Sequence, residues 1–357
     1  MNNEWEKFLL SNNAQLDNNH VKSFGHSIGE EQNAYSGLII ADLSYYALIE
    51  ASGDDVVEFL QGQLTNDIKL VTDELGQLSA YCSPKGRILA SFRIFMRDGH
   101  YFLKLHSDIL EATLKRLRMF VMRSKVELTD SSDKFARIGI AGTNSSNKLT
   151  AIFTALPENT DESLTEDEMT IIKLPGTLPC YEVHGPVEKV KVLWQKLQND
   201  AVAVGENSWN LLTIRAGIPE IVAETVEAFV PQMVNLQAIN SLSFTKGCYP
   251  GQEVVARMHY LGKLKRRLFI GSVETDTLPI PGQSILTKSE NEEKAGQIVS
   301  ASWSNDKSVE ILAVLQIEKA ENEVLHIGSN DDSTIHTIQL IDLPYSLDQN
   351  EKKTNKT

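Results

Sequence analysis

The last quarter of the chain, from about residue 262 onward, is a series of short β-rich runs separated by turns. Several short strands at even spacing are typical of a small all-β barrel. A chain of 357 residues has room for two or three domains, so this barrel accounts for only one of them. We therefore predict a C-terminal β-barrel over residues 262–345. Its candidate strands are RLFIGSV, QSILT, AGQIVSAS, EILAVLQI and TIHTIQLID.

The residues before the barrel mix helical and strand patterns. Residues 1–36 are polar and poor in aliphatic side chains, which indicates a loosely ordered arm around a short helix. Residues 37–125 follow as a first α/β unit, with strands expected at 88–97 and 101–106 around an Asp-Gly turn. Apolar residues then repeat at helical spacing, at Leu110, Leu114, Leu117 and Val121.

A second α/β unit is expected over residues 126–205. It contains strand-like segments near 135–140 and 180–184. The acidic segment 158–168 between them is expected to be a mobile surface loop. A helix in the unit 126–205 carries apolar residues at Val187, Val190, Trp194 and Leu197.

The last residues, 346–357, are predicted to form a disordered tail.

Composition excludes several classes of protein. The net charge of −14 makes the surface repel phosphate backbones, so any nucleic-acid contact must come from a local basic patch. Cys82, Cys180 and Cys248 are too few and too widely spaced for a disulfide framework or a dedicated metal site. The N-terminus lacks the features of a secretion signal, and no apolar run approaches the ~18 residues of a membrane span. We therefore expect a cytoplasmic protein without membrane contact.

Residues 246–253, KGCYPGQE, are the most informative segment of the chain. Pro250 suits the first turn of a helix, and a short helix from Gln252 to Met258 is predicted. Cys248 would lie just ahead of that helix, where unpaired N–H groups stabilise an anion. Lys246 adds positive charge two residues away, and both effects lower a thiol pKa.

Cys248 is therefore a candidate thiolate nucleophile, redox sensor or soft-metal ligand, with Lys246 as its activator. The alternative is a buried structural thiol. The local pattern by itself leaves both interpretations open.

Together with three other segments, this pattern resembles the signature of the YgfZ/GcvT family. Residues 59–68 (FLQGQLTNDI), 81–88 (YCSPKGRI) and 215–219 (RAGIP) are similar to the family motifs F-L-Q-G-Q-x-T-x-D, C-x-P-K-G-R and R-x-G-x-P. The matches occur in the family's order, from about residue 40 to 270. The family also includes a mitochondrial iron–sulfur assembly factor and the aminomethyltransferase of glycine cleavage.

The resemblance implies an α+β fold, with three domains in the cloverleaf arrangement of the aminomethyltransferase. The first α/β domain would be discontinuous and consist of residues 37–125 and 206–260. A ferredoxin-like α/β domain over 126–205 would be inserted into it, and the β-barrel would follow. A folate pocket would lie where the parts meet.

The resemblance also implies a function. The chain would be a folate-binding accessory protein, with tetrahydrofolate or another folate as cofactor, that supports iron–sulfur cluster assembly or repair and thereby tRNA modification. Its partners would be iron–sulfur client enzymes, including those that thiolate tRNA. We expect the folate to order a cleft beside Cys248.

Several folate contacts follow from the same resemblance. Trp209 matches a tryptophan that contacts folate in the family, and Tyr46 aligns with a second one. Taken by itself, Trp209 could equally be a core aromatic residue. The remaining implied contacts are Asn66, Arg215, Gln252, Glu253 and Arg257; no metal ligands are implied.

The residues that transfer chemistry would need are missing. One-carbon transferases of the family carry an Asp pair at the positions of Ala90 and Ser91, and neither of these side chains can hold the charge that the reaction centre needs. The transferases also place a pterin-contacting Glu where Arg215 stands. A folate-dependent one-carbon (aminomethyl) transferase with an unrecognised substrate therefore stays only an alternative.

Two basic segments stand out on this acidic chain. Either could bind phosphates or a polyglutamyl tail, so a tRNA-binding module that uses residues 257–267 is a second alternative. Ordinary solvated faces paired with nearby acids would explain the same pattern. The first segment holds Lys246, Arg257, His259, Lys263, Lys265, Arg266 and Arg267, and the second holds Lys115, Arg116, Arg118, Arg123 and Lys125.

Overall fold

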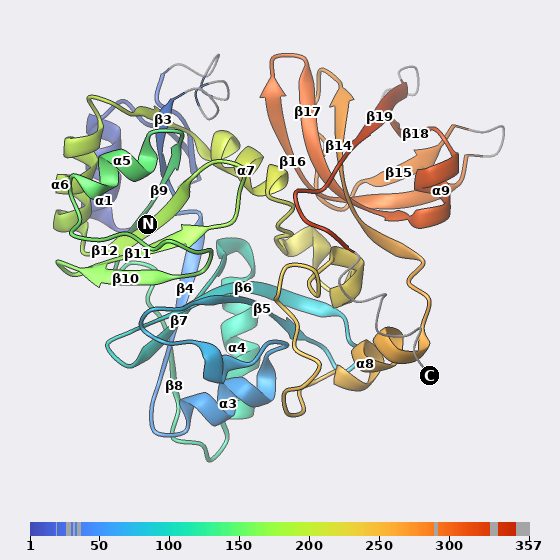
Figure 1. The fold of residues 1–357 in the computed structure, drawn as a ribbon, viewed down its shortest axis with the longest axis horizontal. Helices are drawn as coiled ribbons and strands as arrows, with labels where there is room; N and C mark the ends of the chain where they lie inside the picture. Colours follow the sequence, from blue (N-terminus) through green and yellow to red (C-terminus); the bar gives the residue numbers. More distant parts are fainter. Residues whose placement is uncertain are drawn as a thin grey trace.

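The computed structural model describes residues 1–18, 20–25, 30, 33, 37–288, 292–328 and 335–347. Within these residues, the β-structure comprises a five-stranded sheet, a six-stranded sheet, a closed barrel and a two-stranded hairpin. Figure 1 shows three lobes, with the five-stranded sheet below, the six-stranded sheet at upper left and the barrel at upper right. No helix in the described ranges is long and apolar enough to cross a membrane.

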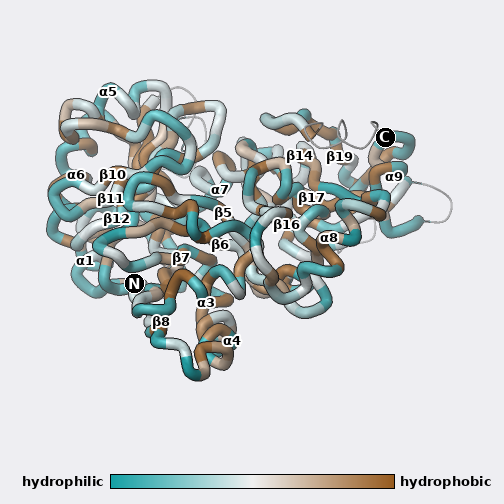
Figure 2. The backbone as a smooth tube through the Cα atoms, turned by 60° about the horizontal axis from the view of Figure 1, so that its bottom comes forward, coloured by the Kyte–Doolittle hydropathy of each residue, from teal (hydrophilic) through white to brown (hydrophobic). Residues whose placement is uncertain are grey.

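The five-stranded antiparallel sheet packs its apolar side chains against two helices in one core. Figure 2 shows hydrophobic stretches in the strands and helices of this lobe. The predicted strands at 88–97 and 101–106 and the helical repeat from Leu110 are confirmed. The strand order is β5 (Gln77–Cys82), β6 (Ile88–Arg97), β7 (His100–His106), β4 (Tyr46–Ser52) and β8 (Glu127–Asp130); the helices are α3 (Val56–Gln63), α4 (Leu110–Val121) and the short 3-10 helices η1 (Ile68–Leu70) and η2 (Ser107–Ile109).

The six-stranded sheet has its own core, covered by three helices. Its pairings are antiparallel except for the parallel pair β13–β3. All four apolar residues expected on the helix near 187–197 are buried. The strand order is β10 (Ser163–Glu166), β11 (Met169–Leu174), β12 (Cys180–Gly185), β9 (Ala136–Gly142), β3 (Leu38–Asp42) and β13 (Val202–Val204), with α1 (Asn3–Ser11), α5 (Ser145–Thr150) and α6 (Val187–Leu197).

Two strands pair with a different sheet from the one that the predicted domain boundaries assign them, and the N-terminal segment is more ordered than expected. β3, expected in the 37–125 unit, pairs with β9 because its apolar run is buried throughout and needs an interior position. β8, expected in the 126–205 unit, pairs instead with β4. The predicted polar arm at 1–36 contributes α1 and a hairpin of β1 (Gln15–Asp17) and β2 (His20–Ser23), and α1 buries Trp5 and Leu9 beside α6.

The acidic segment 158–168 connects the two sheets and is not the mobile loop that we expected. Part of it forms β10 at the edge of the six-stranded sheet. Ser163 donates its backbone N–H to the carbonyl of Glu74 at 2.8 Å, and the carbonyl of Asp161 accepts from the backbone of Gly76 at 2.7 Å. Asp161 also forms an ion pair with Arg93 of β6. A buried guanidinium needs a counter-ion, and the acidic segment supplies one.

After the six-stranded sheet, the chain returns to the five-stranded sheet through α8 (Gln252–Leu261) and the segment before it. α7 (Glu206–Arg215) lies between the six-stranded sheet and the barrel (Figure 1). α8 buries Val255 in the core of the five-stranded sheet. A Cβ on Gly251 would lie 2.6 Å from the Cα of Gly86, so the two motifs pack backbone against backbone. The 3-10 helices η3 (Ala223–Thr225) and η4 (Pro231–Val234) lie between α7 and α8 in the chain.

The C-terminal β-barrel is confirmed. It closes through the pairing of β14 with β19. β18 and α9 add to the predicted runs, because elements of four and six residues give little sequence signal. Residues 348–357 of the predicted tail lie outside the described residues. The barrel order is β14 (Arg266–Glu274), β17 (Ser308–Gln316), β16 (Lys294–Asn305), β15 (Ser284–Thr287), β18 (Leu325–Gly328) and β19 (Ile335–Ile341), with α9 (Ile317–Asn322) after β17.

Replacement of Trp5 tests whether the N-terminal segment is an integral part of the fold. The Trp5 ring packs 5.8 Å from that of Trp194, and its Nε1 donates to Asp42 Oδ1 at 2.7 Å. We expect Trp5→Ala to lower the free energy of unfolding by about 3–5 kcal/mol in urea denaturation. Leu10→Ala, on the exposed side of the same helix, should change it by less than about 0.5 kcal/mol. Equal effects of the two variants would contradict this packing.

Candidate functional site

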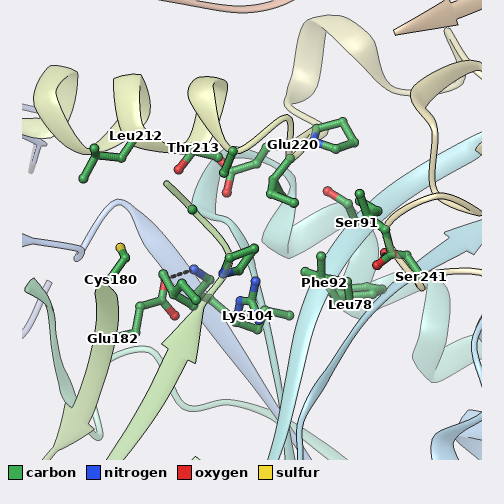
Figure 3. Close-up of a pocket in the computed structure, with 18 of the residues that line it drawn as sticks. Leu78, Ser91, Phe92, Lys104, Cys180, Glu182, Leu212, Thr213, Glu220 and Ser241 are labelled. Atoms are coloured by element: carbon green, nitrogen blue, oxygen red, sulfur yellow. Dashed lines mark hydrogen bonds and ion pairs between the residues drawn. The ribbon is translucent and has the colours of Figure 1, made fainter. Parts of the chain in front are cut away.

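A cavity lies where the two open sheets meet α7 and the loop that follows it (Figure 3). Its walls come from β4–β7, from the segment 174–182 and from residues 209–220, with a smaller contribution from 236–241. Its empty volume is about 930 Å³, including the space open to solvent at its mouth. A cavity that opens to solvent between several elements, with apolar walls and a few polar groups, is typical of a ligand site.

The two predicted aromatic contacts, Tyr46 and Trp209, both line this cavity. Trp209 is also almost fully buried, so it is a core residue and a cavity wall at the same time. Its ring lies against the bare backbone of Gly139 in β9, where a Cβ would come within 2.3 Å of the indole. Glycine at position 139 therefore makes room for the tryptophan ring.

A buried ion pair between Lys104 of β7 and Glu182 of β12 forms part of the wall. The Lys104 ammonium also lies 3.9 Å from the centroid of the Tyr46 ring, in a cation–π contact. Burial alone would raise the pKa of Glu182, but Lys104 and a hydrogen bond with His184 hold that pKa well below its usual range. Glu182 is therefore ionised, and its charge is compensated within the wall.

The second carboxylate in the wall belongs to Glu220, on the loop after α7. Its Oε1 accepts a hydrogen bond from the Tyr46 hydroxyl at 2.5 Å. The neighbouring Ile221 donates its backbone N–H to Ser91 Oγ at 3.0 Å. Ser91 lines the cavity, whereas Ala90 points into the core of the five-stranded sheet. Neither position of the transferases' acidic pair thus carries an acid here.

Arg215 also borders the cavity, but its guanidinium reaches the barrel. Its Nε donates to Glu310 Oε2 of β17 at 2.7 Å, and its second terminal nitrogen forms a bond with Glu310 Oε1. This bidentate pair fixes the end of α7 to the barrel.

Cys248 lies in the loop before α8, with an exposed side chain. Lys246 nearby is mostly buried and donates from Nζ to the carbonyl oxygens of Gln61 at 2.5 Å and Leu64 at 2.6 Å. Burial lowers the pKa of Lys246 to about 8, although the negative charge of Asp67 opposes that shift. The thiol is therefore accessible, whereas the Lys246 ammonium, predicted as its activator, is bonded to backbone carbonyls in the interior.

The structure does not bring this thiol to the cavity, because Cys248 is not among the lining residues. The same holds for four of the predicted folate contacts. Asn66 donates from Nδ2 to the carbonyls of Leu78 and Asn240, at 3.0 and 2.7 Å. It thus connects two segments of the wall without lining the cavity itself. Gln252, Glu253 and Arg257 lie on α8, outside the lining, and Glu253 is exposed.

Four charged residues of the wall were not identified from the sequence: Arg93, Lys104, Glu182 and Glu220. Lys104 and Glu182 lie in strands, where a single charged residue looks like part of a solvated face. Glu220 directly follows the R-x-G-x-P motif, and its position next to a family motif is the one feature of the sequence that could have marked it as a site residue. Among the described residues, no group of three or more His, Cys, Asp or Glu side chains could hold a metal ion.

The two basic segments differ in how their charges are used. At 257–267, Lys263, Lys265 and Arg266 lie on or near the surface, while Arg267 approaches Glu321 at 4.0 Å. At 115–125, Lys125 pairs with Asp54 at 3.0 Å, and Arg118 donates to the carbonyl of Leu128. The first segment is thus the more open of the two.

Comparisons with known proteins agree on one group of relatives. Residues 14–243 match the family described as the GCVT N-terminal domain. The "tRNA-modifying protein YgfZ" of Colwellia psychrerythraea is 34% identical over 310 residues, covering 86% of this chain and 93% of the relative. The protein of the same name from Yersinia pseudotuberculosis serotype IB is 34% identical over 313 residues, with 87% and 93% covered.

Among solved structures, glycine cleavage system aminomethyltransferase T from Bartonella henselae superimposes with a TM-score of 0.76. The match covers 95% of this chain and 96% of that one, at 14% sequence identity. At this identity the likeness concerns the fold alone. The expected aminomethyltransferase-like fold, mixed in α and β and with a C-terminal barrel, is thereby confirmed.

The Lys104–Glu182 pair gives a prediction about stability and pH. Lys104→Met leaves Glu182 buried without its cation and should lower the free energy of unfolding by about 3–5 kcal/mol at pH 7, measured in urea. The ion pair lowers the pKa of Glu182 in the folded state, so its stabilisation is present above the ordinary glutamate pKa of 4.5 and is lost as the pH falls below that value. The difference between wild type and variant should therefore shrink in acid.

The double variant Lys104→Met/Glu182→Leu is the matched control for that experiment. It replaces both charges with apolar groups of similar size and should recover most of the lost stability at pH 7. A deficit that stays constant as the pH falls from neutral into acid, or a double variant as unstable as the single one, would contradict the ion-pair interpretation.

Proposed function

The chain belongs to the YgfZ/GcvT family, and from this premise we propose that it is a folate-binding protein that takes part in tRNA modification. Its relatives named as tRNA-modifying proteins match it over 93% of their length, which supports a role of the same kind. The cavity between the two sheets is the observation that carries the folate part of the proposal.

The chemistry of the cavity fits a folate. A pterin needs hydrogen-bond partners, and the aminobenzoyl ring needs aromatic or apolar walls. Tyr46, Trp209 and Phe92 supply aromatic surface, Leu236 supplies apolar surface, and Glu220 supplies a carboxylate that can accept N–H groups. Tetrahydrofolate bound there would supply a reduced pterin that carries one-carbon units.

Binding without aminomethyl transfer is favoured by the residues at the acidic-pair positions. Ala90 lies in the core and Ser91 Oγ accepts a backbone hydrogen bond, so neither can act as the carboxylate acid–base group of that reaction. The alternative of a one-carbon transferase would require another acid–base group. Turnover of labelled tetrahydrofolate would be the result in its favour.

The finer part of the proposal concerns iron–sulfur clusters. The exposed thiol of Cys248, a soft ligand on an accessible loop, suits a transient contact with the iron of a client enzyme's cluster. One cysteine cannot hold a cluster stably, so the cluster remains the client's. We assign this role to assembly or repair of clusters in client enzymes, including those that thiolate tRNA.

A separate tRNA-binding module is the weaker alternative. The surface residues Lys263, Lys265 and Arg266 could contact phosphates. Salt-dependent binding of tRNA that is lost on charge reversal of Arg266 and Arg267 would favour that module. The folate-binding function does not depend on this outcome.

Calorimetric titration with tetrahydrofolate tests the proposed ligand. Trp209→Phe keeps an aromatic wall with a smaller ring and should weaken binding several-fold, whereas Trp209→Ala removes the wall and should weaken it about tenfold or more. Tyr260→Ala, which removes an exposed aromatic residue of α8 outside the cavity, serves as the control and should bind as wild type does. Wild-type protein that does not bind any reduced folate would refute the proposal.

Cys248→Ala tests the proposed role of the thiol. The side chain is exposed, so its removal leaves no internal cavity and should shift the melting temperature by less than about 2 °C. In a strain that lacks the native protein, the variant should fail to restore the level of thiolated tRNA, measured by mass spectrometry of nucleosides. Thr245→Ala, in the same exposed loop, is the control and should restore it. Full restoration by Cys248→Ala would rule out the thiol's role.

A further inference from the structure

Within the described ranges, Glu220 differs from Arg93, Lys104, Glu182 and Arg215 at the cavity in forming no ion pair; His106, whose pKa the Glu220 charge helps to raise, is paired with Asp108. Lys104 is paired with Glu182, Arg215 with Glu310, and Arg93 with Asp161. In the described part of the chain, the bond that Glu220 accepts through its side chain comes from the Tyr46 hydroxyl, and no basic side chain forms an ion pair with it. A carboxylate has about four lone-pair positions, so most of its accepting capacity faces the cavity.

The loop that carries Glu220 is fixed at both ends. Gly217, with a φ of +67°, lies against the ring of Tyr345, where a Cβ would come within 2.6 Å of it. The Tyr345 hydroxyl donates to the Gly217 carbonyl at 2.9 Å. Beyond Glu220, Ile221 is bonded to Ser91, and the backbone N–H of Ala223 donates to Asp108 Oδ2 at 2.8 Å. The carboxylate is therefore held in place before any ligand arrives.

The surroundings of Glu220 define the group that it would bind. Figure 3 shows it on the α7 side of the cavity, with Ser91 to its right, Phe92 next to Leu78 further down, and Lys104 and Glu182 on the strands across from it. Two parallel N–H groups on a flat ring edge match a carboxylate in the same way as a guanidinium does. Aromatic walls at Tyr46 and Trp209 favour a planar ring.

We propose that Glu220 is the specificity-determining residue of the cavity and accepts the ring N–H and 2-amino group on the 2-amino-4-oxo edge of a pterin. This inference rests on the proposed folate-binding function and deepens it. Position 215, the site of the transferases' pterin-contacting glutamate, holds an arginine that is bonded to Glu310 here. The carboxylate would thus be supplied five residues further along the chain, from the loop. Tyr46 acts as a positioning residue, since its hydroxyl orients Glu220.

Calorimetry with two ligands tests the assignment: tetrahydrofolate and its 2-desamino analogue, which lacks the amino group. Wild-type protein should bind tetrahydrofolate about 10- to 100-fold more tightly than the analogue, because a hydrogen bond to a charged group is lost. Glu220→Gln should weaken tetrahydrofolate binding by a similar factor and abolish most of the discrimination between the two ligands. Glu224→Gln, an exposed glutamate on the same loop, is the matched control and should keep both affinities.

The outcomes separate this inference from the function on which it rests. If wild-type protein binds tetrahydrofolate but discriminates equally well with Glu220→Gln, the assignment of Glu220 is overturned and folate binding stands. Equal wild-type affinity for both ligands overturns the assignment without any variant. If wild-type protein binds neither ligand, the proposed function and this assignment fall together. Tyr46→Phe should reduce the discrimination partially, because it leaves the carboxylate in place but removes its orienting bond.

Discussion

The ion pair of Lys104 and Glu182 joins two sheets that belong to different lobes, and the cavity depends on that junction. Burying two charges is unfavourable unless each satisfies the other, so the geometry between the sheets is tightly specified once both residues are enclosed. Arg93 and Asp161 make a second connection between the same sheets. The cavity is therefore bounded by polar contacts of fixed geometry, and its aromatic side chains lie against a rigid frame.

Much of the fold follows from local patterns in the sequence. The barrel strands and the helix at 187–197 have the periodicity that their burial requires, and the structure confirms both. The N-terminal segment is harder to predict because two buried side chains, Trp5 and Leu9, are hidden in a polar composition. The membership of β3 and β8 is equally hard to predict, since strand pairing between distant residues leaves no local signal.

The site was only partly accessible from the sequence. Tyr46 and Trp209 were found because they occupy positions that the family uses, and both line the cavity. The wall charges Lys104, Glu182 and Glu220 become recognisable only when the lobes are assembled, since each acquires its partner from a different element. Conversely, the signature segment lies apart from the cavity. The close backbone approach of Gly86 and Gly251 gives the glycines of these motifs a packing function.

The barrel is connected to the loop that carries Glu220 by two contacts. Arg215, at the end of α7, pairs with Glu310 of β17, and Tyr345, which follows the last barrel strand, packs on Gly217 of the loop. A rotation of the barrel would displace both Arg215 and Gly217, and with them the start of the loop. A ligand whose affinity depends on the position of this loop would therefore be coupled to movement of the barrel, and the coupling would act equally in both directions.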